Sequence, residues 1–234
     1  MNRLNHLIIC VPLVWILVSH TIAHGTRTEI AGRIPAGAYQ YLEQSEKGAS
    51  PFEWRISYPG DLVEISVDSE EYKTFNRCQM DGETLFWSVF RSDGLVVSAE
   101  RQDDVLIITQ TSKGATSTVK YHIDDRPWYQ PLSFSLHELL SGKWQSIEFW
   151  SIRIDTNEPV LLKATRIGTE DLNIENQVFS AVIVEIKATG LLSMFWSGSY
   201  WFSEDNDLFL KYKSRISVPG MADKNVTLVS WATD

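Results

Sequence analysis

The sequence predicts an all-β protein with one short helix, folded as a strongly curved antiparallel meander that makes a half-barrel or barrel-like sheet. Short runs rich in β-branched and aromatic residues follow one another from residue 39 to the end of the chain. Turn-forming pairs such as Asp81-Gly82 and Lys113-Gly114 separate the runs, and such pairs adopt the positive φ angles that tight hairpins require. Several runs are apolar at successive positions. A sheet made from them must cover both faces, or use one face to line an apolar cavity.

The chain contains a regular series of β-prone runs. In the first half, candidate strands lie at residues 39–44, 52–58, 62–68, 72–79, 84–91, 95–101, 105–111 and 116–123. In the second half they lie at residues 146–154, 160–167, 178–188, 197–203, 208–218 and 226–232, and the polar stretch 168–177 is either a loop or the edge of a strand. Because short turns join most of these runs, each strand is expected to pair antiparallel with the next one.

Residues 124–142 interrupt the series of strands. Prolines in this stretch stop strand pairing. Residues 134–140 carry apolar side chains at helical spacing, so we expect the single helix of the protein here. Ser133 or Ser135 is expected to cap the start of this helix, and Gly142 is expected to end it.

Residues 1–25 have the three-part pattern of a secretory signal peptide. Arg3 supplies a positive charge before an apolar run at residues 7–18, and Ala23 provides a small side chain at a cleavage site. The apolar run is shorter than the roughly 20 residues that a membrane-spanning helix needs. We therefore expect cleavage to leave residues 26–234 as a single β-rich domain, exported to the periplasm or outside the cell, with no transmembrane span.

The charge and the cysteine content argue against two classes of protein. The net charge of the chain is −9 at pH 7, and an acidic surface repels phosphate, so no nucleic-acid partner is expected. Cys10 lies in the predicted leader, which leaves Cys78 as the single cysteine of the mature chain and excludes a disulfide framework. Cys78 stands in an alternating strand-like run, where a small buried thiol is expected.

Metal-binding and cofactor-binding motifs are incomplete. His137-Glu138 begins like the helical zinc motif, but Ser141 stands where the second histidine belongs. We therefore expect no metal site. No nucleotide-binding loop or haem motif is present, so no cofactor is expected. Asn225 begins an N-glycosylation pattern, which matters only in a eukaryotic secretory pathway.

One alternative function is an acidic hydrolase or lyase built around His122. This histidine is followed by Asp124 and Asp125 where a predicted strand ends, and Glu148 and Glu170 are further candidate carboxylates. A histidine with a carboxylate would suit acid–base chemistry. An acidic stretch at the end of a strand is more typical of a solvated turn, however, so we assign no catalytic residue.

Aromatic residues are the most distinctive feature of the strands. The tripeptide Phe-Trp-Ser occurs at residues 86–88, 149–151 and 195–197. Aromatic residues are common in strands on propensity alone, but a concave face lined with them would also offer a large apolar area to a ligand. The candidate ligand-binding residues are Trp87, Trp150, Trp196, Trp201 and Phe134.

The segment 200–212 resembles the closing hairpin of uncharacterised bacterial periplasmic proteins that are similar in fold to the LolA and LolB lipoprotein carriers. In this hairpin Trp201, Asp205, Leu208 and Lys211 fill the aromatic, acidic, apolar and basic positions. The resemblance implies an incomplete barrel whose concave face holds lipid or another apolar group beneath a helical cover. The sequence departs from that pattern because it offers little helix besides the one short stretch.

The sequence therefore favours an exported, non-catalytic protein that binds an apolar ligand, a lipid or an acyl chain in an aromatic-lined concave sheet, with envelope maintenance as its setting. A second hypothesis is a protein-binding or structural envelope module that uses exposed aromatic residues to contact envelope proteins. The acidic hydrolase is the third.

Overall fold

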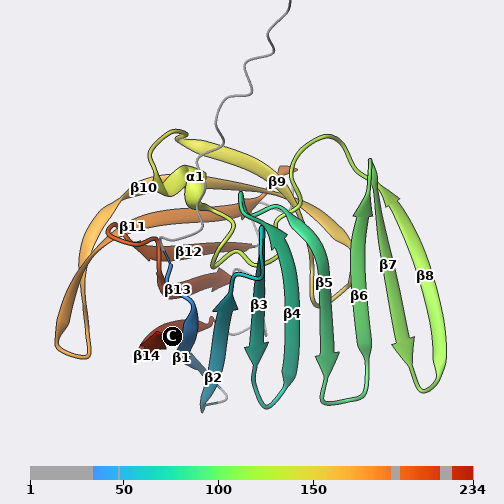
Figure 1. Ribbon diagram of the computed structural model, residues 1–234, viewed down its shortest axis with the longest axis horizontal. Coiled ribbons are helices and arrows are strands. Elements are labelled where there is room, and N and C mark those ends of the chain that lie inside the picture. Colours follow the sequence, from blue (N-terminus) through green and yellow to red (C-terminus); the bar gives the residue numbers. More distant parts are fainter. Residues whose placement is uncertain (1–33, 47, 191–195, 217–222, 234) are drawn as a thin grey trace, which may run out of the picture.

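One antiparallel sheet of 14 strands makes up most of the protein (Figure 1). The computed structural model describes residues 34–46, 48–190, 196–216 and 223–233. The predicted signal peptide lies outside the described residues. The strands are β1 (Gly37–Ser45), β2 (Gly48–Ser57), β3 (Leu62–Asp68), β4 (Tyr72–Gln79), β5 (Thr84–Arg91), β6 (Val96–Gln102), β7 (Val105–Ser112), β8 (Ala115–His122), β9 (Ser146–Ile152), β10 (Pro159–Ile174), β11 (Gln177–Ala188), β12 (Trp196–Ser203), β13 (Phe209–Ile216) and β14 (Asn225–Thr233).

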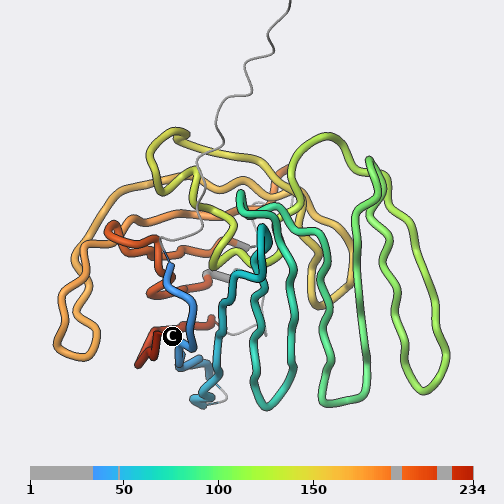
Figure 2. Tube along the Cα trace, viewed as in Figure 1, coloured from blue at the N-terminus to red at the C-terminus, as the bar shows by residue number. Residues whose placement is uncertain are grey.

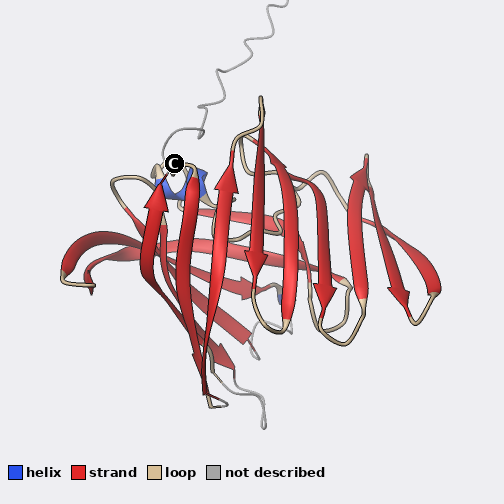
Figure 3. Ribbon diagram, turned by 60° about the horizontal axis from the view of Figure 1, so that its bottom comes forward, coloured by secondary structure: helices blue, strands red, loops and turns tan. Residues whose placement is uncertain are grey.

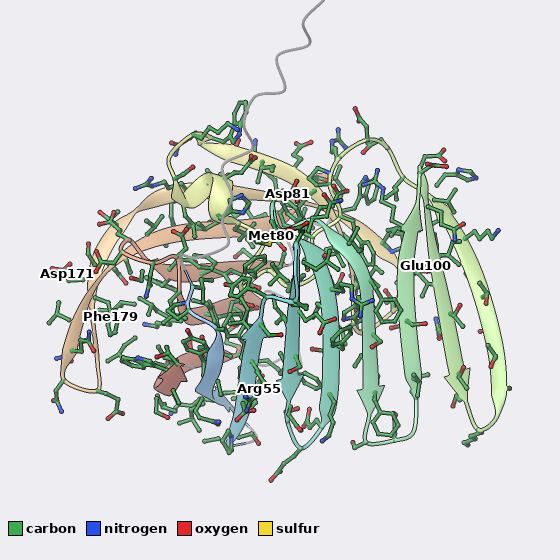
Figure 4. All side chains as sticks on the ribbon, in the orientation of Figure 1. Arg55, Met80, Asp81, Glu100, Asp171 and Phe179 are labelled. Carbon is green, nitrogen blue, oxygen red and sulfur yellow. The ribbon has the colours of Figure 1, made fainter. Side chains whose placement is uncertain are left out.

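The antiparallel meander is confirmed. Each run predicted from the sequence forms a strand, and consecutive strands pair throughout, except that β8 and β9 do not pair. The stretch 168–177 belongs to β10 and β11, which turn at Glu175 and Asn176, both at positive φ (50° and 65°). Asp171 and Phe179 lie on this projecting hairpin (Figure 4). Its polar sequence reflects exposure of most of its side chains rather than a loop.

The first and last strands of the chain lie next to each other in the middle of the sheet. β1 pairs antiparallel with β14, which places the two strands side by side (Figure 2). The sheet is not closed into a barrel, because β8 and β9, consecutive in the chain, are its two edges. Figure 3 shows the bend of the sheet and the flatter part that ends in β8.

The helix α1 (His137–Leu140) is shorter than predicted and begins differently. Leu136 occupies the N-cap position without a side-chain hydrogen bond, so the prediction of a serine cap is wrong. Ser135 instead donates its hydroxyl hydrogen bond to the Gly82 carbonyl, at 2.7 Å. Gly142 ends the helix as predicted, with φ of 74°.

The buried apolar residues form two hydrophobic cores. The inner core is enclosed by β1–β4 and β9–β14, and residues such as Phe134 and Leu139 from the helical segment cover one end of it. Figure 4 shows side chains filling this space. The overlap core is a separate buried cluster formed by Trp87, Val89, Val97, Ala99, Leu106, Ile108, Ile123, Trp128 and Ile152.

The strand β9 shows how the two cores are related. Phe149 belongs to the inner core, whereas Ile152 belongs to the overlap core and Trp150 packs against it. Alternate side chains of a strand point to opposite faces. Both faces of β9 are therefore covered. The inner core lies on one face, and the residues of β5–β7 that form the overlap core lie on the other.

The expectation that apolar strands are covered on both faces is wrong for β5. Trp87 and Val89 on its concave side are buried. On its other side Phe90 is 53% exposed, because no layer covers the convex face there. The apolar residues of β5 are thus split between a core and an open surface.

Candidate functional site

Aromatic rings line the concave wall formed by β1, β2, β12 and β13. We call this set the aromatic cluster: Tyr41, Phe52, Tyr200, Phe202, Phe209 and Tyr212. The strand register produces it, because Tyr41 is opposite Phe52 and Tyr200 is opposite Tyr212. Residues directly opposite on paired strands point to the same face. The rings of Tyr41 and Phe52 stack with centroids 5.3 Å apart, and those of Tyr200 and Tyr212 are 4.8 Å apart.

The deep part of the aromatic cluster is tightly packed, and the Tyr41 hydroxyl there has a hydrogen-bond partner. Tyr41 and Phe202 are buried, and the Tyr41 hydroxyl donates to the Phe209 carbonyl at 2.8 Å. Burial raises the pKa of Tyr41 and of Tyr200 well above the usual tyrosine value, and neighbouring tyrosines raise it further. These phenols stay protonated at any physiological pH.

The other end of the wall is accessible. Phe52, Val67 and Tyr212 face the inner core but are only partly buried. Phe52 lies in the first half of β2, Val67 lies near the end of β3, and Tyr212 lies on β13 next to Val226 of β14. We call this set of partly buried residues the open end. An ion pair between Lys224 and Glu43, 2.7 Å apart, lies beside it. The open end thus combines an apolar wall with a charged rim.

Two buried polar atoms of strands β2 and β4 lack hydrogen-bond partners. They are Nε1 of Trp54 on β2 and Oδ1 of Asn76 on β4, and both residues are buried. The Trp54 ring packs edge-on against Tyr39 at 5.2 Å. An unpaired buried polar atom costs about 1–3 kcal/mol. The two residues therefore offer one donor and one acceptor to anything that reaches them.

The structure divides the predicted ligand-binding residues between the two cores. Trp87 is buried in the overlap core and Trp150 packs against that core, whereas Phe134 and Trp201 are buried in the inner core. The Lys211 ammonium also lies 5.0 Å from the centre of the Trp201 ring. The side chain of Trp196 lies outside the described residues. Whether any of these side chains contacts a ligand stays a prediction.

Two surface grooves are open to solvent. One, of about 530 Å³, is lined by Pro51 and Phe52 together with polar residues such as Gln40, Glu53 and Lys73. The other, of about 320 Å³, is lined by the charged residues of β9–β11 and their neighbours. Neither groove is lined by a tryptophan.

His122 and the carboxylates proposed for acid–base chemistry have different partners, although Asp124 and Glu148 share Arg126. His122 lies 3.3 Å from Asp104, and both side chains are largely exposed. Asp124 accepts a hydrogen bond from Trp150 at 2.8 Å, which is the main reason that its pKa is lowered. Arg126 pairs with Asp124 at 2.9 Å and with Glu148 at 3.4 Å.

Of the other two candidate carboxylates, Asp125 is exposed, and Glu170 accepts a hydrogen bond from the Trp201 indole at 2.6 Å. His122, Asp124 and a second carboxylate therefore do not converge in a pocket. Among the residues that the structure describes, no group of three or more His, Cys, Asp or Glu side chains is placed to hold a metal ion. The same part of the chain contains no helix long and apolar enough to cross a membrane.

Comparison with solved structures identifies a shared fold. The chain is similar to a β-barrel-like protein of the domain of unknown function DUF1849 from Brucella abortus, with a TM-score of 0.63 and 10% identity over 86% of this chain and 99% of that chain. The likeness shows the fold alone. No protein-family model and no curated protein matches the sequence.

A hypothetical lipoprotein, YmcC from Escherichia coli, aligns over 85% of this chain and 90% of its own with 10% identity and a TM-score of 0.35. Neither description names a LolA or LolB carrier. The DUF1849 structure thus supports the resemblance predicted from the closing hairpin only as far as a β-barrel-like fold.

Sequence reasoning missed the aromatic cluster because it concentrated on tryptophan. The available signal was the alternation of aromatic residues along single strands, at Tyr39 and Tyr41 and again at Tyr200 and Phe202. Alternation places such pairs on one face. The contact between β1 and β13 residues depends on β1 pairing with β14, however, and no local pattern indicates that pairing.

Proposed function

We propose that this protein is an exported, non-catalytic binding protein that holds an acyl chain or a similar apolar ligand against the aromatic cluster at the open end. The proposal depends on a change in side-chain burial from one part of the aromatic cluster to another. Tyr41 is fully buried, whereas Phe52 and Tyr212, in contact with the same cluster, remain partly exposed. Apolar walls with a few polar groups are typical of small-molecule sites.

The rest of the site suits an amphipathic ligand. An acyl chain would cover the exposed parts of Phe52, Val67 and Tyr212, and each buried methylene would contribute about 0.8 kcal/mol. A polar head would remain at the rim, near Lys224 and Glu43. A hydroxyl or carboxyl group that reached deeper would find the Trp54 indole and the Asn76 carbonyl oxygen without other partners.

The fold supports this proposal without identifying the ligand. The helical segment covers one end of the inner core, and the partly buried residues Phe52, Val67 and Tyr212 leave apolar surface for a ligand. The predicted signal peptide and the bacterial origin of the structure with the same fold support a setting in the cell envelope.

Titration of the purified protein with cis-parinaric acid, a fluorescent fatty acid, tests the proposal. We expect saturable binding that Phe52→Glu weakens at least about 10-fold, because the ligand would then have to bury a carboxylate or leave its contact with the ring. Phe90→Glu is the matched control, since Phe90 is 53% exposed on the convex face. Absence of saturable binding, or equal loss in both variants, would contradict the proposal.

A further inference from the structure

The two edge strands of the sheet, β9 and β8, differ in whether other backbone covers them. Residues 127–130 run beside β9 and satisfy its edge: the Trp150 N–H donates to the Pro127 carbonyl and the Tyr129 N–H donates to the Trp150 carbonyl, each at 2.9 Å. The Gln130 side chain then bonds both backbone groups of Ile152, at 2.9 and 3.0 Å. The β9 edge is thus closed to other strands.

The β8 edge has no such cover. Within the described ranges β8 ends the sheet and pairs only with β7 (Figure 1). Every residue of β8 except Tyr121 is exposed. A strand edge of this kind carries a row of unpaired N–H and C=O groups that can bind another strand.

The backbone of β8 shows which residues face outward. The Ile123 N–H donates to the Asp104 carbonyl at 2.8 Å, so this pair is hydrogen bonded. Hydrogen-bonded and non-hydrogen-bonded pairs alternate along antiparallel strands. Ser117, Val119 and Tyr121 therefore bond to β7, whereas the residues at even positions direct their backbone groups to the open edge. The outward-facing residues are Thr116, Thr118, Lys120 and His122.

Side-chain contacts support this assignment. The hydroxyls of Thr118 and Thr109 lie 3.1 Å apart, and those of Thr116 and Thr111 lie 3.0 Å apart. Side chains approach most closely in non-hydrogen-bonded pairs. The backbone groups of these threonines on β8 therefore point away from β7.

Most devices that protect an edge from pairing are missing from β8. It contains no proline, and its register with β7 has no bulge over the 8 residues of the strand. Threonine and valine have high strand propensity. Lys120 is its only lysine or arginine, and β8 contains no acidic residue although the chain carries a net charge of −9. Two copies would therefore meet least repulsion at this edge.

We propose that β8 binds β8 of a second copy of this chain, antiparallel, about a two-fold axis at Val119, so that one sheet continues through both molecules. This register places each Val119 opposite its equivalent, each Thr118 opposite Lys120, and each Thr116 opposite His122. All four outward-facing residues of each strand then find backbone partners. Val119, now 43% exposed, packs against its copy.

The charge on Lys120 selects this register. A shift of one residue would turn every side chain of a strand to the other face of the sheet. One strand can therefore shift against the other only by two residues at a time, which moves the two-fold axis by one residue. Centring the axis on Lys120 would place two ammonium groups directly opposite each other, which is destabilising. Centring it on Thr118 would leave the backbone groups of His122 unpaired. The Val119-centred register avoids both costs.

Sedimentation velocity tests the association. An interface of two short strands falls below about 1,200 Å², so association is expected only at high protein concentration, approaching about 1 mM. We expect Val119→Lys to abolish it, because two new ammonium groups would face each other. Val178→Lys, at a site 66% exposed on the β10–β11 hairpin, should associate like the wild type.

A second variant separates the open edge from the fold. Thr118→Pro removes an N–H that points away from β7, so it should abolish association while the far-ultraviolet circular dichroism and the melting temperature stay close to those of the wild type. A wild type that stays monomeric up to 1 mM, or dimers that persist in both β8 variants, would overturn the proposal.

Disulfide trapping tests the register directly. Val119→Cys should form a reducible dimer under mild oxidation at least about 10-fold faster than Val178→Cys, because non-hydrogen-bonded pairs hold their side chains close together. The native Cys78 is buried and does not compete. Equal rates for the two variants would rule out a pair centred on Val119.

Discussion

At the scale of single residues, the sequence identifies what is buried better than what is exposed. Cys78 is confirmed as a buried thiol, at 0% exposure. Its alternating neighbours and its small size were sufficient for that prediction. The tryptophans were harder to place, because a large apolar ring suits the inner core and the overlap core equally well. Only the tertiary structure separates Trp87 from Trp201.

The Cys78 thiol should be unreactive in the folded protein. Burial raises the pKa of Cys78 to about 12, an effect that a hydrogen bond involving Thr84 partly offsets. The thiolate is the reactive form, so we expect labelling by a chromogenic disulfide reagent at pH 8 only after unfolding in urea. Val178→Cys should supply one rapidly labelled thiol in the native state. Rapid labelling of the wild type would show that Cys78 is accessible.

At the scale of elements, local chemistry predicted the strands and only part of the helical segment. Strand limits follow from residues whose φ angles are fixed by the turns, such as Lys113 and Gly114 at 50° and 80°. The start of α1 was mispredicted because Ser135 has a tertiary partner, Gly82, which is far away in the sequence. A capping rule that considers only local bonds cannot take account of that contact.

Gly82 fixes the helical segment to the turn between β4 and β5. Its φ is 87°, and a Cβ atom there would lie 2.8 Å from the Ser135 Cα. We expect Gly82→Ala to lower the free energy of unfolding by about 3 kcal/mol, because strain and collision add. Chemical denaturation monitored by tryptophan fluorescence measures this change.

Gly94→Ala is the matched control for Gly82→Ala. Gly94 has a φ of 85°, but nothing lies within 4 Å of the position that a Cβ would occupy. Gly94→Ala should therefore lower the free energy of unfolding by only about 1 kcal/mol, the cost of the backbone strain. Equal losses in the two variants would show that the contact with Ser135 contributes nothing.

At the scale of the whole molecule, the sequence predicted a curved meander but not how it rolls. Pairing between neighbours in the chain is specified by turns and alternation. The pairing of β1 with β14, and the packing of β9 under β5–β7, join segments that are far apart in the sequence. Those contacts depend on the summed twist of all the strands, which no single motif records.

The buried phenols and the thiol should make the fold sensitive to alkali. Burial raises the pKa of Cys78 and of Tyr72 to about 12, and it raises the pKa of Tyr41 and Tyr200 further. A group whose pKa is raised on folding stabilises the fold below its unfolded pKa and loses that contribution as pH rises toward the folded value. Stability should therefore fall from about pH 9 upward.

Urea denaturation at pH 8, 10 and 11 measures this loss. Cys78 alone should account for about 3 kcal/mol by pH 11, at about 1.4 kcal/mol for each pKa unit. Cys78→Ala, although less stable at pH 8, should show a flatter dependence between pH 8 and 10, while the tyrosine contribution above pH 10 remains. A wild-type stability that is constant up to pH 11 would contradict the assigned burial.

We propose above all that an apolar chain binds to the aromatic cluster at the open end. The most direct measurement is the set of nuclear Overhauser effects between uniformly ¹³C-labelled palmitate and the aromatic protons of the protein. The account predicts contacts from the methylene groups to the rings of Phe52 and Tyr212, and none to Phe90 on the convex face. Contacts confined to Phe90, or no contacts at a saturating palmitate concentration, would contradict it.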